Sequence, residues 1–183
     1  MPKRSDNYLV WIDCEMTGLD PRRDVLLEIA SIITDYDLTI VARGPVLAIR
    51  QSESKLGLMD AWNRRTHGRS GLIARVRGEG VPVAEAERQT LAFVRRHCYV
   101  RTAPLCGNSI GQDRQFLLKY MPRLEAFLNY RSVDVSSIKV LVKGWYGKKH
   151  EAPKKKDLHQ ALADIEESIA ELDHYRRHVF VRR

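Results

Sequence analysis

The chain contains few cysteines and no long hydrophobic run. Its 183 residues include three cysteines, Cys14, Cys98 and Cys106, an odd number at wide spacing. Such a set does not build a disulfide framework, and no two of these residues have the close spacing of a structural zinc site. No apolar stretch approaches the roughly 20 residues that a membrane-spanning helix needs, and the first residues lack the apolar stretch of a secretory signal. We therefore expect a cytoplasmic protein with no zinc and no membrane partner.

Acidic residues are also scarce relative to basic ones. Lysine and arginine total 31 against 23 aspartates and glutamates, which gives a formal net charge of +8. This excess favours a polyanionic partner, with nucleic acid first, although a well-solvated basic surface is the plainer explanation. With 44% hydrophobic and 30% charged residues, the composition is that of a folded chain. The length fits a single domain over residues 1–183, with a core from 7 to 181.

The first half of the chain predicts an antiparallel meander. Three segments rich in strand-forming residues follow one another, at Leu9–Asp13, Val25–Thr34 and Thr39–Ile49. Asp35–Asp37 has the composition of a hairpin turn, and Gly44–Pro45 interrupts the third segment, which indicates a bulge or a sheet edge. Short turns between successive strands favour antiparallel pairing.

The second half changes to helices that alternate with short strands. The predicted helices cover 83–97, 112–121, 136–142 and 158–177, and the predicted strands cover 105–106 and 132–135. This order predicts an α/β fold with a mixed sheet covered by helices. From Lys143 to Asp157, with its lysine-rich part at 144–157, we expect an exposed loop. That loop is either a solvated connector or a segment that attracts phosphate.

Four carboxylates and one histidine stand out along this pattern. Asp13 and Glu15 end the first apolar strand, Asp113 lies in the first turn of a predicted helix, and the last helix carries Asp164. Side chains two apart on a strand face the same way, so two of these acids can point at one place. Carboxylates that close repel one another unless a cation lies between them. The pattern therefore predicts a site for two divalent ions, Mg²⁺ or Mn²⁺, which take oxygen ligands.

His159 precedes Asp164 by five positions, a spacing of roughly 140° around a helix. We therefore expect His159 at the beginning of the helix or in the preceding loop, where it could accept a proton from a metal-activated water. Each residue alone also has a plainer explanation: a strand-end turn for Asp13, a favourable helix charge for Asp113, a solvated position for Asp164 and a helix cap for His159. Their occurrence together, in this order, favours catalysis.

Several segments of the chain resemble a known family. The segments Asp13–Leu19, Gly107–Asp113, Tyr130–Ser136 and His159–Asp164 resemble the oligoribonucleases, a branch of the DEDDh exonucleases with the ribonuclease H-like fold. Two further stretches, Met59–Asn63 and Thr66–Leu72, indicate this branch specifically. The resemblance implies a homodimer that removes 5′-mononucleotides from the 3′ end of short RNA, two to five nucleotides long, by a two-metal mechanism with a histidine base.

The same resemblance assigns roles to individual residues. Asp13, Glu15, Asp113 and Asp164 match the metal ligands, His159 matches the general base, and Tyr130 matches a tyrosine that acts in the partner's site. Leu19 matches a wedge between two bases, Trp62 and His67 match the base pockets, and Ser109, Arg131 and Ser136 match a cap over the 5′ phosphate. Two other hypotheses stay open, a general DEDDh exonuclease and a non-catalytic nucleic-acid-binding module with this fold.

Overall fold

A mixed sheet forms the centre of the molecule. The computed structural model describes residues 4–153 and 160–180. The strands are β1 (Leu9–Met16), β2 (Leu26–Thr34), β3 (Ile40–Arg43), β4 (Leu47–Ala48), β5 (Pro104–Gly107) and β6 (Asn129–Asp134). They run in the order β3-β2-β1-β5-β6, with β4 also paired to β2. The first three strands are antiparallel, whereas β5 and β6 are parallel to β1. The predicted α/β fold, with an antiparallel meander in a mixed sheet, is confirmed.

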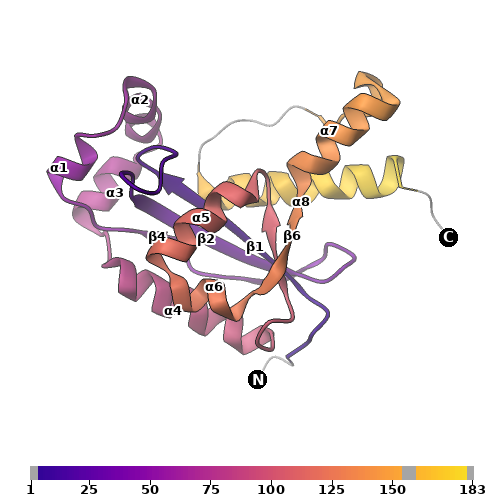
Figure 1. The fold of residues 1–183 in the computed structure, drawn as a ribbon, viewed down its shortest axis with the longest axis horizontal. Helices are drawn as coiled ribbons and strands as arrows, with labels where there is room; N and C mark the ends of the chain where they lie inside the picture. Colours follow the sequence, from indigo (N-terminus) through magenta and orange to yellow (C-terminus); the bar gives the residue numbers. More distant parts are fainter. Residues whose placement is uncertain (1–3, 154–159, 181–183) are drawn as a thin grey trace.

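Helices cover both faces of this sheet (Figure 1). One face carries α4 (Val83–His97), α5 (Ile110–Tyr120) and α6 (Pro122–Phe127), and the other carries α7 (Val135–Tyr146) and α8 (Ala161–His178). Three short helices, α1 (Glu53–Leu56), α2 (Ala61–Arg69) and α3 (Leu72–Gly78), lie near the end of the sheet where β2 begins. Within the described ranges, no helix combines the length and apolar character needed to cross a membrane.

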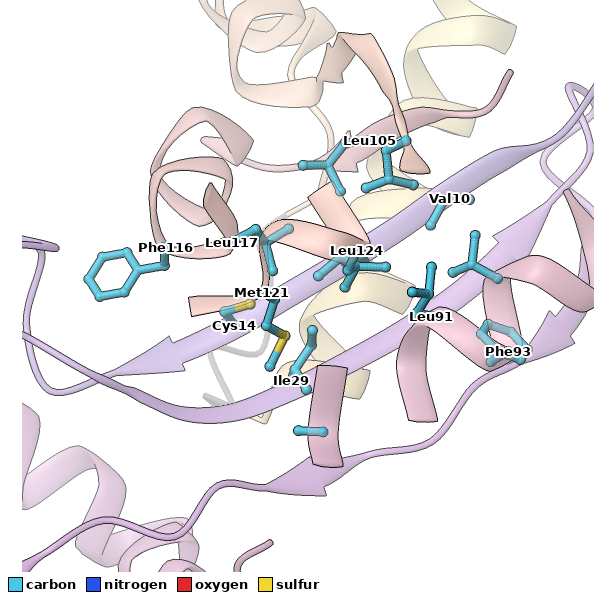
Figure 2. Close-up of a cluster of buried hydrophobic side chains, with 14 of the residues drawn as sticks. Val10, Cys14, Ile29, Leu91, Phe93, Leu105, Phe116, Leu117, Met121 and Leu124 are labelled. Atoms are coloured by element: carbon cyan, nitrogen blue, oxygen red, sulfur yellow. The ribbon is translucent and has the colours of Figure 1, made fainter. Parts of the chain in front are cut away.

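The alternation of β1 decides which side chains face which layer. Val10 and Cys14 point into the core cluster that the strands form with α4, α5 and α6, as Figure 2 shows. Trp11 belongs to the opposite cluster, which includes the apolar face of α8. Because alternate side chains of a strand share a face, Asp13 and Glu15 project to the α8 side. The Cys14 side chain points away from the two acids, into the cluster on the other face of the sheet.

The predicted loop over 143–157 is wrong in its first part. Helix α7 continues to Tyr146, and a single 3₁₀ turn covers Lys148–His150. The helix continues past Lys143 although Gly144 lies inside it, and it ends at Gly147, where φ is +79°, a value that favours glycine. Lys154–Asp157, which complete the lysine-rich stretch, lie outside the described residues.

Candidate active site

Three carboxylates converge where β1 ends. Asp13 and Glu15 come from β1, and Asp164 comes from the first turn of α8, which packs on that side of the sheet. One oxygen of each lies within 4.8 Å of the others, and all three side chains are partly exposed. The predicted convergence of these acids is therefore present.

Asp113 approaches from the opposite layer. It lies in the first turn of α5, with its side chain 5% exposed, and its Oδ1 accepts a hydrogen bond of 2.9 Å from the backbone N–H of Cys14. Cys14 stands between the two acids of β1, so this bond fixes the fourth carboxylate beside them. Asp13, Glu15 and Asp113 line one pocket.

The site raises the pKa values of two of its carboxyl groups. Burial, followed by repulsion from Asp164, Glu28 and Asp113, raises the pKa of Glu15 to about 8. Burial, opposed in part by the bond from Cys14, raises the pKa of Asp113 to about 7. Such shifts mean that the negative charges lack compensation by neighbouring cations. A set of carboxylate oxygens under this repulsion fits hard divalent ions such as Mg²⁺ or Mn²⁺.

The pocket above the acids has apolar walls. Its cavity volume is about 250 Å³, and its lining includes Leu19 and Trp62. These two side chains are 72% and 53% exposed, although both are large and apolar. Trp62 lies in the first turn of α2, a helix capped by Asp60, whose side chain accepts from the N–H of Asn63. Two apolar surfaces over an acidic floor can hold flat rings while the acids act on an adjoining group.

A polar cluster closes the pocket beside β6. Ser109 lines the pocket, and its N–H donates to the hydroxyl of Ser136 (3.0 Å) and to the carboxylate of Asp134 (3.0 Å). Asp134 also caps α7 by accepting from the N–H of Ser136 (2.9 Å). These bonds hold the two serines together. They also give Asp134 a structural part.

The predicted residues His67, Tyr130 and Arg131 do not belong to the lining of this pocket. His67 is 2% exposed, with its Nε2 3.0 Å from the carbonyl oxygen of Met16 and its Nδ1 3.9 Å from Glu15 Oε2, so it lies beneath the acids and does not line the wall. Tyr130 is 75% exposed on β6, and the guanidinium of Arg131 lies 4.7 Å from its ring centroid. His159 lies outside the described residues.

The chain matches known exonucleases over most of its length. Residues 10–172 match the model of the RNase_T exonuclease family. The oligoribonuclease of Alkalilimnicola ehrlichii is 57% identical over 95% of this chain and 90% of its own, and that of Aeromonas hydrophila is 58% identical over 96% and 97%. The chain belongs to the oligoribonuclease family. It is accordingly a hydrolase, a metal-dependent 3′-to-5′ exoribonuclease.

More distant solved structures share the oligoribonuclease fold. Escherichia coli exonuclease I, in complex with a dT13 oligonucleotide, superposes with a TM-score of 0.74 at 14% identity, over 94% of this chain. Exonuclease I of Methylocaldum szegediense gives a TM-score of 0.71 at 20% identity. The present chain spans 41% of each of these longer chains. The shared architecture is the ribonuclease H-like fold that the resemblance implied.

Two further residues at the site, Asn108 and Glu28, had no role assigned to them in the sequence analysis. Asn108 lines the pocket, donates to Ser168 on α8 (2.8 Å) and accepts from Ser136 (3.0 Å). Glu28, 2% exposed and directly opposite Glu15 in the strand register, is ion-paired to Arg75 of α3. Asn108 stands inside the Gly107–Asp113 motif, and Glu28 is an acid inside an otherwise apolar strand; these were the available signals.

Proposed function

We propose that this chain hydrolyses very short RNA, dinucleotides and slightly longer, to 5′-mononucleotides. The observation that carries the proposal is the small pocket in which apolar side chains stand over converging carboxylates. Leu19 and Trp62 contact the bases without reading their identity, because every base offers a flat apolar face.

The four acids hold two divalent ions, Mg²⁺ or Mn²⁺. The raised pKa values of Glu15 and Asp113 support this, because bound cations would supply the compensation that these carboxylates lack. When bound, such ions would supply Lewis-acid chemistry that makes water more acidic and offsets negative charge on the phosphodiester. We assign ligand roles to Asp13, Glu15 and Asp113, which line the pocket, and to Asp164, which converges with the first two.

The reaction adds water across one phosphodiester bond. A water oxygen attacks the phosphorus next to the 3′-terminal nucleotide, and the bond to the 3′ oxygen of the preceding nucleotide breaks. That oxygen leaves with a proton, and the terminal nucleotide departs with a 5′ phosphate. We assign the removal of the water proton to His159, because its position shortly before α8 is close in sequence to Asp164.

The polar cluster at β6 limits the length of the substrate. Ser109 and Ser136 offer hydroxyl groups that are joined at 3.2 Å, and the neighbouring strand β6 carries Arg131. Hydroxyls and a guanidinium suit a terminal phosphate, so this cap would stop a longer chain from extending past it. His67 Nδ1 lies 3.9 Å from Glu15 Oε2, and we keep the base-pocket role of His67 as a prediction.

The active form is a homodimer that uses α7 and the edge strand β6. Large apolar side chains on α7 are exposed to solvent, among them Val140 at 69% and Trp145 at 72%, and Tyr130 on β6 is 75% exposed. A folded monomer rarely leaves such groups together in water. Tyr130 would then reach the partner's pocket, and the described lining of its own pocket does not include it. We place this dimer in the cytoplasm.

A comparison of substrate lengths tests the proposal. The purified protein with Mn²⁺ should cleave a diribonucleotide much faster than a 20-nucleotide RNA of the same concentration, with 5′-mononucleotides as the product. The Asp13→Ala variant, prepared in parallel, controls for contaminating nucleases. Equal turnover of both substrates by the parental protein would contradict the length limit while leaving the exonuclease assignment intact.

A further inference from the structure

Hydrogen bonds hold the loop between β1 and β2 together. Asp24, 5% exposed, occupies its centre and accepts from the hydroxyl of Thr17 (3.1 Å) and from the N–H of Asp20 (3.0 Å). At Gly18 a Cβ atom would lie 2.5 Å from the Asp24 carboxylate, so the loop closes around this group only with glycine there. The loop carries Leu19 at its tip.

Helix α5 holds the same loop from outside. Gln112 Nε2 donates to the carbonyl oxygen of Leu19 (2.6 Å), Lys119 Nζ to that of Pro21 (2.5 Å), and the hydroxyl of Tyr120 to that of Asp24 (2.6 Å). Gln112 and Lys119 are two helical turns apart and therefore share one face of α5. Gln112 is the one of these three donors that holds the tip of the loop.

Leu19 stands between two hollows of the surface. On one side is the pocket over the acids, and on the other is an open depression that Leu19 lines together with Asp20, Pro21, Arg22 and Gln115. Its side chain is 72% exposed, so packing does not hold it in place. The conformation of Leu19 therefore depends on its backbone, and the bond from Gln112 fixes that backbone.

We propose that Gln112 is a positioning residue that presents Leu19 to the bases of the substrate. This rests on the proposed function, in which Leu19 contacts the bases, and on the wedge role that the family resemblance implies for it. The next residue of α5, Asp113, is bonded to the N–H of Cys14, so a single helical turn fixes both the acids and the wedge. A wedge ordered before binding spares the substrate the entropic cost of ordering the loop.

A double-mutant cycle on a diribonucleotide tests this role. Gln112→Ala should raise KM about fivefold, the effect of one lost neutral hydrogen bond, and change kcat less than about twofold. In the Leu19→Ala background the same substitution should change KM less than about twofold, because there is no wedge left to position. Gln89→Ala is the matched control, since the Gln89 amide donates to Glu85 within α4, away from the pocket.

The outcomes separate this inference from the proposed function. An equal rise of KM in both backgrounds would overturn the positioning role, because Gln112 would then act independently of Leu19. An unchanged KM in the Gln112→Ala single variant would overturn it as well. An unchanged KM in Leu19→Ala, by contrast, would refute the wedge role on which the inference rests.

Discussion

Removing divalent ions should make the stability of this protein fall steeply with rising pH. In the ion-free protein the pKa of Glu15 is raised from 4.5 to about 8, first by burial and then by Asp164, Glu28 and Asp113. Between these two values the folded chain holds a proton that the unfolded chain has already released. The free energy of unfolding therefore decreases as the pH rises from about 4.5 to 8, and the loss is complete above that range.

The size of this loss follows from the same shift. At 1.36 kcal/mol for each pKa unit, the Glu15 shift corresponds to a ceiling of roughly 5 kcal/mol. The Glu15 side chain is 14% exposed and can turn toward water, so we expect about 2–3 kcal/mol. For a domain of this size, that corresponds to a decrease of roughly 5–10 °C in Tm. Bound Mg²⁺ or Mn²⁺ should reverse the decrease, because such ions favour the charged carboxylates.

Thermal unfolding followed by circular dichroism measures this effect. Tm should be recorded from pH 5 to 8.5, with EDTA and with excess Mn²⁺. Glu15→Gln should remove much of the pH slope in EDTA and raise Tm above the parental value at pH 8, because the amide does not ionise. Glu166→Gln, which changes an exposed glutamate paired with Arg43, should leave the slope unchanged. A parental Tm in EDTA that stays flat over this range, or that matches Glu15→Gln at each pH, would refute the reasoning.

Three further outcomes follow from the proposed site and assembly. Asp13→Ala should lower kcat by at least about a thousandfold with a normal circular dichroism spectrum, and near-parental turnover would exclude Asp13 as a metal ligand. The hydrolysis rate with saturating metal should fall as the pH drops below about 6.5, because a protonated His159 accepts no proton. The His159→Gln variant should hydrolyse RNA much more slowly, and its rate should show no such inflection with pH. An unaltered pH–rate profile in that variant would exclude the base role. Trp145→Glu should convert a dimer to a monomer in light scattering. Trp145→Glu and Tyr130→Ala, each as a single variant, should lower turnover. A fully active monomer would contradict the role of Tyr130 in the partner's site.

The central sheet was predictable because burial and alternation act on its sequence directly. β2 is buried at all nine positions, and a mostly apolar run is typical of such a strand. Asp13 and Glu15 were predictable for the converse reason, since acids at the end of a buried strand need a specific explanation. Asp113 was predicted to lie in the first turn of a helix, and its place in the first turn of α5 confirms this.

The short helices between β4 and α4 were not predictable from periodicity. In α2, which runs from Ala61 to Arg69, the one buried side chain is His67, so no apolar stripe marks the helix. Capping by Asp60 and contact with α3 stabilise it instead, and these depend on the tertiary fold. The burial of His67 against Glu15 had the same cause, because a pattern along the chain does not reveal which side of a distant strand a helix will meet.

The position of Cys14 between the acids makes its thiol a reporter of opening in this region. Burial and the surrounding carboxylates raise its pKa well above the ordinary value, and burial raises the pKa of Cys98 to about 11. A protonated sulfur is a poor nucleophile, and all three thiols are buried. Alkylation of Cys14 should therefore proceed only while β1, the strand that carries the acids, is detached from α5. The alkylation rate would then report how often β1 separates from the folded core.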